Sequence, residues 1–211
     1  MPARFALFAL FLAVAPCKAQ KWTGAIKIGT AYTTFSGNLI AGQTDWEPLT
    51  GLAAGSAIGF DFANGLILQL DITYVRKGAA AQILFQGMPA RIQSDLTYLE
   101  LPLLVHGMFE SGSRFHPRLF AGPALAFQLE SHLTHSAATG GGFITEKDES
   151  IQLVDVGAVV GAAIDIESVG QRFFLEARYY HGFTDITEPH PVLGDSEIAH
   201  RSLVVLTGVV F

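Results

Sequence analysis

Apolar and polar residues alternate at every second position over much of this chain. Within residues 66–74 every even-numbered residue is apolar, whereas the odd-numbered positions are mostly polar, as at Gln69, Asp71 and Thr73. Because successive side chains of a β-strand point to opposite faces of the sheet, this period predicts strands with one apolar face. No amphipathic helical pattern accompanies it. The predicted strands are eight, at residues 22–35, 52–62, 66–74, 95–109, 118–130, 154–165, 172–181 and 202–211.

The connections between these strands are alternately long and short. Asn64-Gly65 is a dipeptide that favours a two-residue hairpin turn. In an up-and-down array, every long connection would then lie at the same end. Outer-membrane barrels have short periplasmic turns and longer extracellular loops, and this pattern fits them. The long connections are residues 36–50, 77–94, 131–149 and 184–198.

The polar faces of the strands indicate which side is inside. They are rich in small residues, as at Gly55, Ala57 and Gly59, and only 15% of the chain is charged. Soluble domains have about 25% charged residues. Small residues suit a narrow lumen, and the apolar faces suit lipid. The fold class predicted is therefore all-β, an eight-stranded antiparallel up-and-down transmembrane β-barrel. The alternative is a soluble periplasmic lipocalin-like carrier, whose apolar faces would line a ligand cavity.

The start of the chain has the features of a cleaved export signal. An apolar stretch at Phe5–Ala15 follows a positively charged start, and small residues stand at Cys17 and Ala19. This pattern predicts a signal peptide over residues 1–19, with cleavage before Gln20. A lipid anchor on the cysteine is disfavoured because a proline precedes it. The expected result is Sec-type export to the outer membrane of a Gram-negative bacterium, with residues 20–211 as the barrel domain.

Charged residues on the polar faces would point into the lumen. A small barrel is filled by side chains, and a buried charge must be paired. We therefore expect an ion-paired plug that holds the wall together, with Glu100 and Arg178 facing each other across the lumen. The alternative is a gated or narrow polar pore. The predicted lumen polar cluster consists of Asp71, Glu100, Arg118, Asp155, Glu176 and Arg178.

The rest of the sequence offers only weak candidates for a catalytic or metal-binding site. His200 and Ser202 share a face, with Glu176 on the neighbouring strand, as a hydrolase would need. That face is the predicted lumen, which is too narrow for a lipid substrate. His132 and His135 have an HxxH spacing, but zinc needs three or four ligands. The sequence therefore predicts no enzyme activity, no catalytic residue, no metal site and no cofactor.

Two prolines interrupt predicted strands. Pro102 and Pro123 lie almost equally far from the Gly112-Ser113 turn, so they would meet at nearly the same level of a hairpin. Proline has no backbone N–H to donate to a neighbouring strand. A local bulge or break in the pairing is therefore predicted there.

Four segments resemble a known family of bacterial barrels. They are Ile72–Gly78, Tyr98–Leu104, Leu119–Pro123 and Leu175–Tyr179. On these, the chain resembles the bacterial outer-membrane β-barrel domain family, the porin-like group that includes PorT-like proteins. The resemblance covers the chain after the signal and implies a barrel. It implies no catalytic residue, because most members have no assigned activity.

The long loops are the remaining candidates for function. We expect a non-enzymatic scaffold, adhesin or accessory component of an envelope complex that acts through these loops, and a narrow porin-like channel for small solutes is the alternative. The expected partners are outer-membrane lipid and other envelope proteins, and the chain is expected to be a monomer. Nucleic acid is not expected, because no basic patch stands out and the formal net charge is -6. Apolar residues in the predicted loops are Leu39, Ile40, Trp46, Ile83–Phe85, Phe143, Ile144, Val192 and Leu193.

Overall fold

The computed structural model describes eight stretches of the chain: residues 22–36, 46–63, 65–85, 88–109, 114–137, 144–147, 153–184 and 199–211. These stretches form strands joined by turns and contain no helix that could cross a membrane. The strands are β1 (Trp22–Ser36), β2 (Trp46–Ala63), β3 (Leu66–Phe85), β4 (Met88–Met108), β5 (Phe115–Ala137), β6 (Ile144–Lys147), β7 (Val154–Ser168), β8 (Gln171–Gly182) and β9 (Ala199–Val210).

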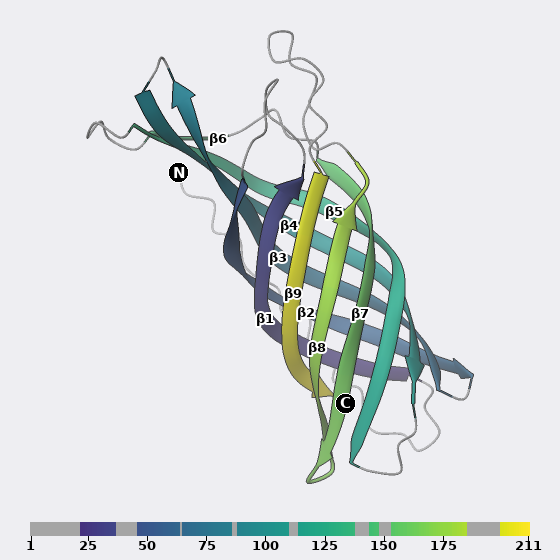
Figure 1. Cartoon of the computed structure of the whole chain (residues 1–211). Helices are drawn as coiled ribbons and strands as arrows, with labels where there is room; N and C mark the ends of the chain where they lie inside the picture. Colours follow the sequence, from purple (N-terminus) through teal and green to yellow (C-terminus); the bar gives the residue numbers. More distant parts are fainter. Residues whose placement is uncertain are drawn as a thin grey trace, which may run out of the picture.

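The strands close into one barrel (Figure 1). The order is β4-β3-β2-β1-β9-β8-β7-β5, and a further β4–β5 pairing completes the ring. Every pairing is antiparallel. The prediction of an eight-stranded up-and-down barrel is therefore confirmed. The short strand β6 is additional. It pairs with β5 at His132–His135, beyond the part of β5 that pairs with β7.

The apolar faces of the strands point outward. Leu68 and Val205 are each 39% exposed, whereas Asp71 and Glu176 are fully buried. Exposed and inward positions alternate along β8 and β9, as the two-residue period requires. A continuous apolar exterior suits hydrocarbon, where only a closed sheet satisfies all its backbone groups. The lipocalin-like alternative is wrong, because that fold needs the apolar faces inside.

Short turns join strands at one end of the barrel. Gly65, in the predicted Asn-Gly hairpin, has a φ of 79°. The turn between β7 and β8 has φ values of 51° at Val169 and 73° at Gly170. Two successive positive φ values define a type I′ turn, whose twist matches that of the flanking strands.

The long connection predicted at residues 77–94 is mostly strand. β3 continues to Phe85 and β4 begins at Met88, with pairing along the whole hairpin. β5 likewise extends to Ala137, into the predicted 131–149 loop. The predicted strands end too early because the alternation of apolar and polar residues stops there. Ala79, Ala80 and Ala81 are all fully buried, so both faces are covered there and no two-residue pattern remains.

The predicted disturbance at the two prolines takes the form of missing rungs. Pro102 pairs with Ala124, and pairing between β4 and β5 resumes at Val105 and Ala121 in the same register. The predicted bulge is therefore absent at this place. The lost rungs follow from the missing proline N–H. The register shift between these strands lies further along, between Thr97 and Tyr98.

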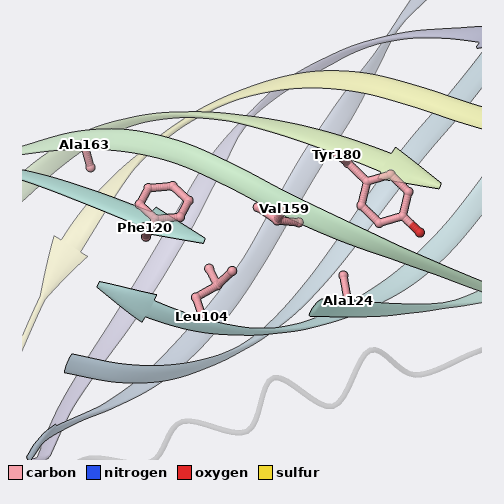
Figure 2. Close-up of a cluster of buried hydrophobic side chains, with 6 residues drawn as sticks. All are labelled: Leu104, Phe120, Ala124, Val159, Ala163 and Tyr180. Carbon is pink, nitrogen blue, oxygen red and sulfur yellow. The ribbon is translucent and has the colours of Figure 1, made fainter. Parts of the chain in front are cut away.

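Hydrophobic clusters line parts of the interior. Figure 2 shows one of them, in which an aliphatic side chain of β4 lies among residues from β5, β7 and β8. A glycine also allows a close approach between the neighbouring strands β4 and β5. A Cβ placed on Gly122 would come within 1.9 Å of the Leu103 carbonyl oxygen. The cluster in Figure 2 consists of Leu104, Phe120, Ala124, Val159, Ala163 and Tyr180.

Candidate functional site

All the residues of the predicted lumen cluster point into the barrel. They come from β3, β4, β5, β7 and β8 and meet buried partners there. They are divided among three groups along the lumen rather than gathered in one. Their exposed fractions are 0% for Asp71 and Glu176, 1% for Glu100, Asp155 and Arg178, and 5% for Arg118.

The central group is organised around Asp71 on β3. Its carboxylate accepts hydrogen bonds from Lys27 Nζ at 2.5 Å, from Arg178 Nη1 at 2.9 Å and from Gln69 Nε2 at 2.7 Å. Glu176 lies 3.7 Å from Lys27 Nζ and 3.8 Å from Arg178 Nη1. Two cations and two carboxylates therefore balance each other. The group links β1, β3 and β8 across the lumen.

The predicted Glu100–Arg178 pair is present but secondary. Arg178 Nη2 lies 3.9 Å from Glu100 Oε2, whereas its Nη1 lies 2.9 Å from Asp71. Glu100 has its short contact with Lys77 Nζ, at 2.6 Å. Lys77 was not among the predicted lumen residues, because it lies in the long connection predicted at residues 77–94. Strand tilt and stagger decide which residues face each other across a barrel, and the alternation pattern contains neither.

A second group is rich in aromatic residues and lies nearer the long connections. Lys77 Nζ is 3.8 Å from the centre of the Tyr180 ring and 5.1 Å from that of Tyr98. The Tyr180 hydroxyl donates to Asp155 Oδ2 at 2.9 Å. The Tyr98 hydroxyl and His200 Nε2 are 3.0 Å apart. A buried ammonium is thus held by a carboxylate and two ring faces, which stabilise a desolvated cation.

The third group lies toward the short turns. Arg118 donates from Nε to Asp165 Oδ1 at 2.9 Å, and its Nη1 lies 3.3 Å from His106 Nδ1. Its guanidinium carbon lies 5.5 Å from the centre of the Phe174 ring. Asp165 ends the strand predicted at residues 154–165 and was not among the predicted lumen residues. Its inward position in the alternation was the signal that could have found it.

The packed interior leaves little space. Asp71, Glu176 and Arg178 are buried, with exposed fractions of 0–1%. A pocket at the short-turn end, lined in part by Lys27, Arg118 and Glu176, has a volume of about 20 Å³. A cavity needs about 10–15 Å³ to hold one water molecule. The geometry is that of a filled lumen.

The candidate hydrolase residues are not arranged for catalysis. His200 directs Nε2 at Tyr98, and the Ser202 hydroxyl has no hydrogen-bond partner among the described residues. His132 is exposed on β5, and the His135 side chain lies outside the described residues. In the part of the chain that the structure describes, no three residues form a metal-binding group.

The long strands continue past the barrel as what we call the extended sheet. It comprises residues 46–48 of β2, 79–85 of β3, 88–94 of β4 and 132–137 of β5, together with all of β6. In Figure 1 these strands rise toward the upper left, past the ends of β8 and β9.

Polar contacts cross the surface of the extended sheet, and an aromatic residue anchors its base. Arg91 Nη1 lies 2.7 Å from Glu47 Oε2, and Gln82 Nε2 donates to Glu47 Oε1 at 3.3 Å. These contacts link β4, β3 and β2. Trp46 packs against the buried cluster of Ala79, Leu96, Tyr98 and Ala126. The sheet is thus continuous with the barrel core.

The apolar residues predicted in loops have mixed positions. Trp46 is half-buried on β2, not in a loop. Ile83–Phe85 belong to β3 and Ile144 to β6, although the structure describes only their backbone. The others lie outside the described residues: Leu39, Ile40, Phe143, Val192 and Leu193.

Comparison with known proteins agrees with the fold. Residues 18–188 match the family described as "Outer membrane protein beta-barrel domain". OprG from Pseudomonas aeruginosa is similar in structure, with a TM-score of 0.55 and 14% identity over 91% of this chain and 97% of that chain. Neisserial surface protein A has a TM-score of 0.47 and 13% identity over 90% and 97%, respectively.

A third similar structure is Ail, the attachment invasion locus protein of Yersinia pestis. Its TM-score is 0.45, with 12% identity over 91% of this chain and 100% of that chain. No curated protein matches the sequence. At 14% identity, the structural likeness to OprG shows the fold alone. The family match and the apolar exterior together show that the chain belongs to the outer membrane protein β-barrel domain family.

Proposed function

We propose that this protein is a non-enzymatic, non-conducting scaffold or adhesin of the outer membrane that binds other envelope proteins through its extended sheet. The main support for this proposal is that several strands are longer than is needed to cross a membrane. A membrane-spanning strand needs about 9–11 residues. β8 and β9 have 12 residues each, whereas β3, β4 and β5 have 20, 21 and 23.

The edge of the extended sheet supports this proposal. β6 pairs with β5 on one side, and no further strand pairs with it among the described residues. The unpaired N–H and C=O groups of an edge strand can bind a strand from another chain. The ordered contacts of Glu47, Gln82 and Arg91 would hold this edge in place above the membrane.

Site-specific crosslinking in the native envelope tests the binding role. A photoreactive residue at Gln82, in the extended sheet, is expected to capture other proteins. The same residue at Leu70, which is 46% exposed on the barrel wall, is expected to capture lipid. Equal protein capture at both positions, or none at Gln82, would contradict the proposal.

A shortened variant separates binding from folding. Replacing residues 82–91 with Asn-Gly would close the hairpin directly after the Ala81–Ile92 pair. We expect the barrel to fold, as judged by the faster migration of unheated protein on gels, and protein capture to be lost. Unchanged capture by the folded variant would exclude the extended sheet as the binding part.

A narrow channel for small solutes is the second candidate, favoured by the charged lumen. Planar-bilayer recordings distinguish the two functions. We expect no steady conductance from the wild-type protein, because buried ion pairs fill its lumen. Arg178→Ala, which vacates space at the centre, is the positive control. Steady wild-type conductance would favour the channel.

We also propose export with cleavage before Gln20 and a monomeric mature protein. The pattern at residues 1–19 supports the cleavage site. The intact mass of protein purified from the outer membrane is expected to correspond to residues 20–211. A mass that retains residues 1–19, or a dimer in detergent, would contradict one part of this proposal.

A further inference from the structure

Two outward-facing polar side chains meet at the long-connection end of β8 and β9. Arg201 pairs with His181 across the two strands, so their side chains lie next to each other on the outer wall. Arg201 is exposed between two buried neighbours, which directs it away from the lumen. His181 lies between the rings of Tyr179 and Phe183, at centre-to-centre distances of 6.3 and 5.4 Å. Its ring is therefore held in place.

This pair lies directly above the apolar wall. The next outward position toward the short turns pairs Tyr179 with Leu203, and Leu203 also pairs with Tyr32 on β1. Exposed tyrosines at this level are typical of the aromatic girdle at a membrane interface. Outward positions recur about every 7 Å along a strand, so Arg201 stands just above the girdle. The outward residues below it on β8 and β9 carry no charge at neutral pH: Phe173, Leu175, Ala177, Tyr179, Leu203, Val205, Thr207 and Val209.

Phosphate groups of membrane lipids lie at this level, immediately outside the hydrocarbon. Arginine binds phosphate with two parallel N–H donors, and an imidazole N–H supplies a third donor. Within the described part of the chain, Arg201 has no ion-pair partner that would compete. Long loops are extracellular in outer-membrane barrels, so the pair faces the outer leaflet. The characteristic lipid of the outer leaflet is the phosphorylated glycolipid lipid A.

We propose that Arg201 and His181 form a binding site for a lipid A phosphate on the outer wall of the barrel, with Tyr179 against the acyl chains and Phe183 against the sugar. The site places a lipid at the β8–β9 face, on the side of the barrel that lacks the extended sheet. It is independent of the lumen and of protein binding by the extended sheet.

Arg76 provides a matched control. It is also exposed, faces outward beside a tyrosine, Tyr74, and has no ion-pair partner among the described residues. Its partner across β4 is Thr97, which is buried and carries no imidazole. Arg76 is thus an exposed, outward-facing arginine like Arg201, but without a histidine beside it.

Native mass spectrometry of the full barrel in detergent tests the site. The probes are bisphosphorylated lipid A, dephosphorylated lipid A, phosphatidylglycerol and inorganic phosphate. We expect Arg201→Gln to weaken binding of bisphosphorylated lipid A about tenfold, because it removes a charge-assisted contact. His181→Leu should weaken it less, and Arg76→Gln should change it less than about twofold. Unheated gel migration checks that each variant is folded.

Several outcomes would overturn the proposal. Equal losses in Arg201→Gln and Arg76→Gln would show that any interfacial arginine suffices. Equal binding of dephosphorylated lipid A would exclude phosphate recognition. If phosphatidylglycerol or inorganic phosphate bound as tightly as lipid A, the assignment to the glycolipid would be wrong. The proposal is supported if Arg201→Gln weakens binding more than Arg76→Gln does, and if this difference is seen only with bisphosphorylated lipid A.

Discussion

The two halves of the barrel wall differ in height. β1, β7, β8 and β9 have 15, 15, 12 and 12 residues, whereas β2, β3, β4 and β5 have 18, 20, 21 and 23. The short half therefore does little more than cross the membrane, and the tall half continues into the extended sheet (Figure 1). The outward residues of one continuous sheet therefore match two solvents. Those of the short half are mostly apolar and suit hydrocarbon, whereas those of the extended sheet include polar and charged residues that suit water.

The lumen joins these two halves. Arg178 extends from β8 in the short half to Asp71 on β3 in the tall half, and Lys27 on β1 contacts the same carboxylate. A charge network that crosses the lumen resists separation of the walls. It also blocks the path that a solute would take. The filled interior and the extended sheet both support the proposal that the protein acts through its extended sheet.

The largest expected effect comes from cutting this connection. Arg178→Met removes one cation and leaves Asp71 and Glu176 buried beside Lys27 alone. Breaking a buried pair in this way costs about 3–5 kcal/mol. The urea midpoint in detergent, followed by unheated gel migration, measures it. Arg178→Met combined with Asp71→Asn restores the charge balance and should be less destabilising than the single change. A double variant as unstable as the sum of both changes would contradict the network.

A charge on the outer wall should distinguish the two solvents. Leu70→Lys places an ammonium on the lipid-facing wall of β3, which costs about 2–4 kcal/mol near the bilayer centre. Gln82→Lys, on the same strand but in the extended sheet, should stay within about 0.5 kcal/mol, as surface changes do. Unfolding in lipid vesicles measures both. Similar losses at the two positions would refute the assignment of Gln82 to water.

The close pairing of β1 with β9 requires a glycine in the short half. A Cβ on Gly29 would come within 1.9 Å of the Val205 carbonyl oxygen, whereas one on Gly107 would meet nothing within 4 Å. Gly29→Val is therefore expected to cost about 1–3 kcal/mol through overpacking. Gly107→Val is the matched control on β4. Equal shifts of the thermal midpoint in the two variants would show that this contact does not constrain the pairing.

The smallest expected effect concerns the extended sheet itself. The Glu47–Arg91 ion pair is exposed, with each side chain 44% accessible. Arg91→Ala should cost about 0.2–1 kcal/mol, as exposed pairs do, and salt should reduce the difference. Thermal midpoints at low and high salt measure it. A loss that salt leaves unchanged would mean that Arg91 contributes through packing rather than through charge.

Much of the barrel could be predicted because alternation is a local property. Leu68 and Asp71 lie on opposite faces whatever their partners are, so inside and outside follow from the sequence once lipid and water are assigned. The strand ends could not be predicted where alternation fails. At Ala79–Ala81 both faces are buried, and only the pairing of β3 with β4 shows that the strand continues.

The lumen partners illustrate the same division. The sequence by itself determined that Asp71, Glu100 and Arg178 face inward, because a strand has a period of two. Only the tertiary structure decided that Arg178 lies nearest Asp71 and that Glu100 pairs with Lys77. The tilt and stagger of the closed barrel set which residues are level across the lumen, and these belong to the whole ring of strands rather than to any one of them.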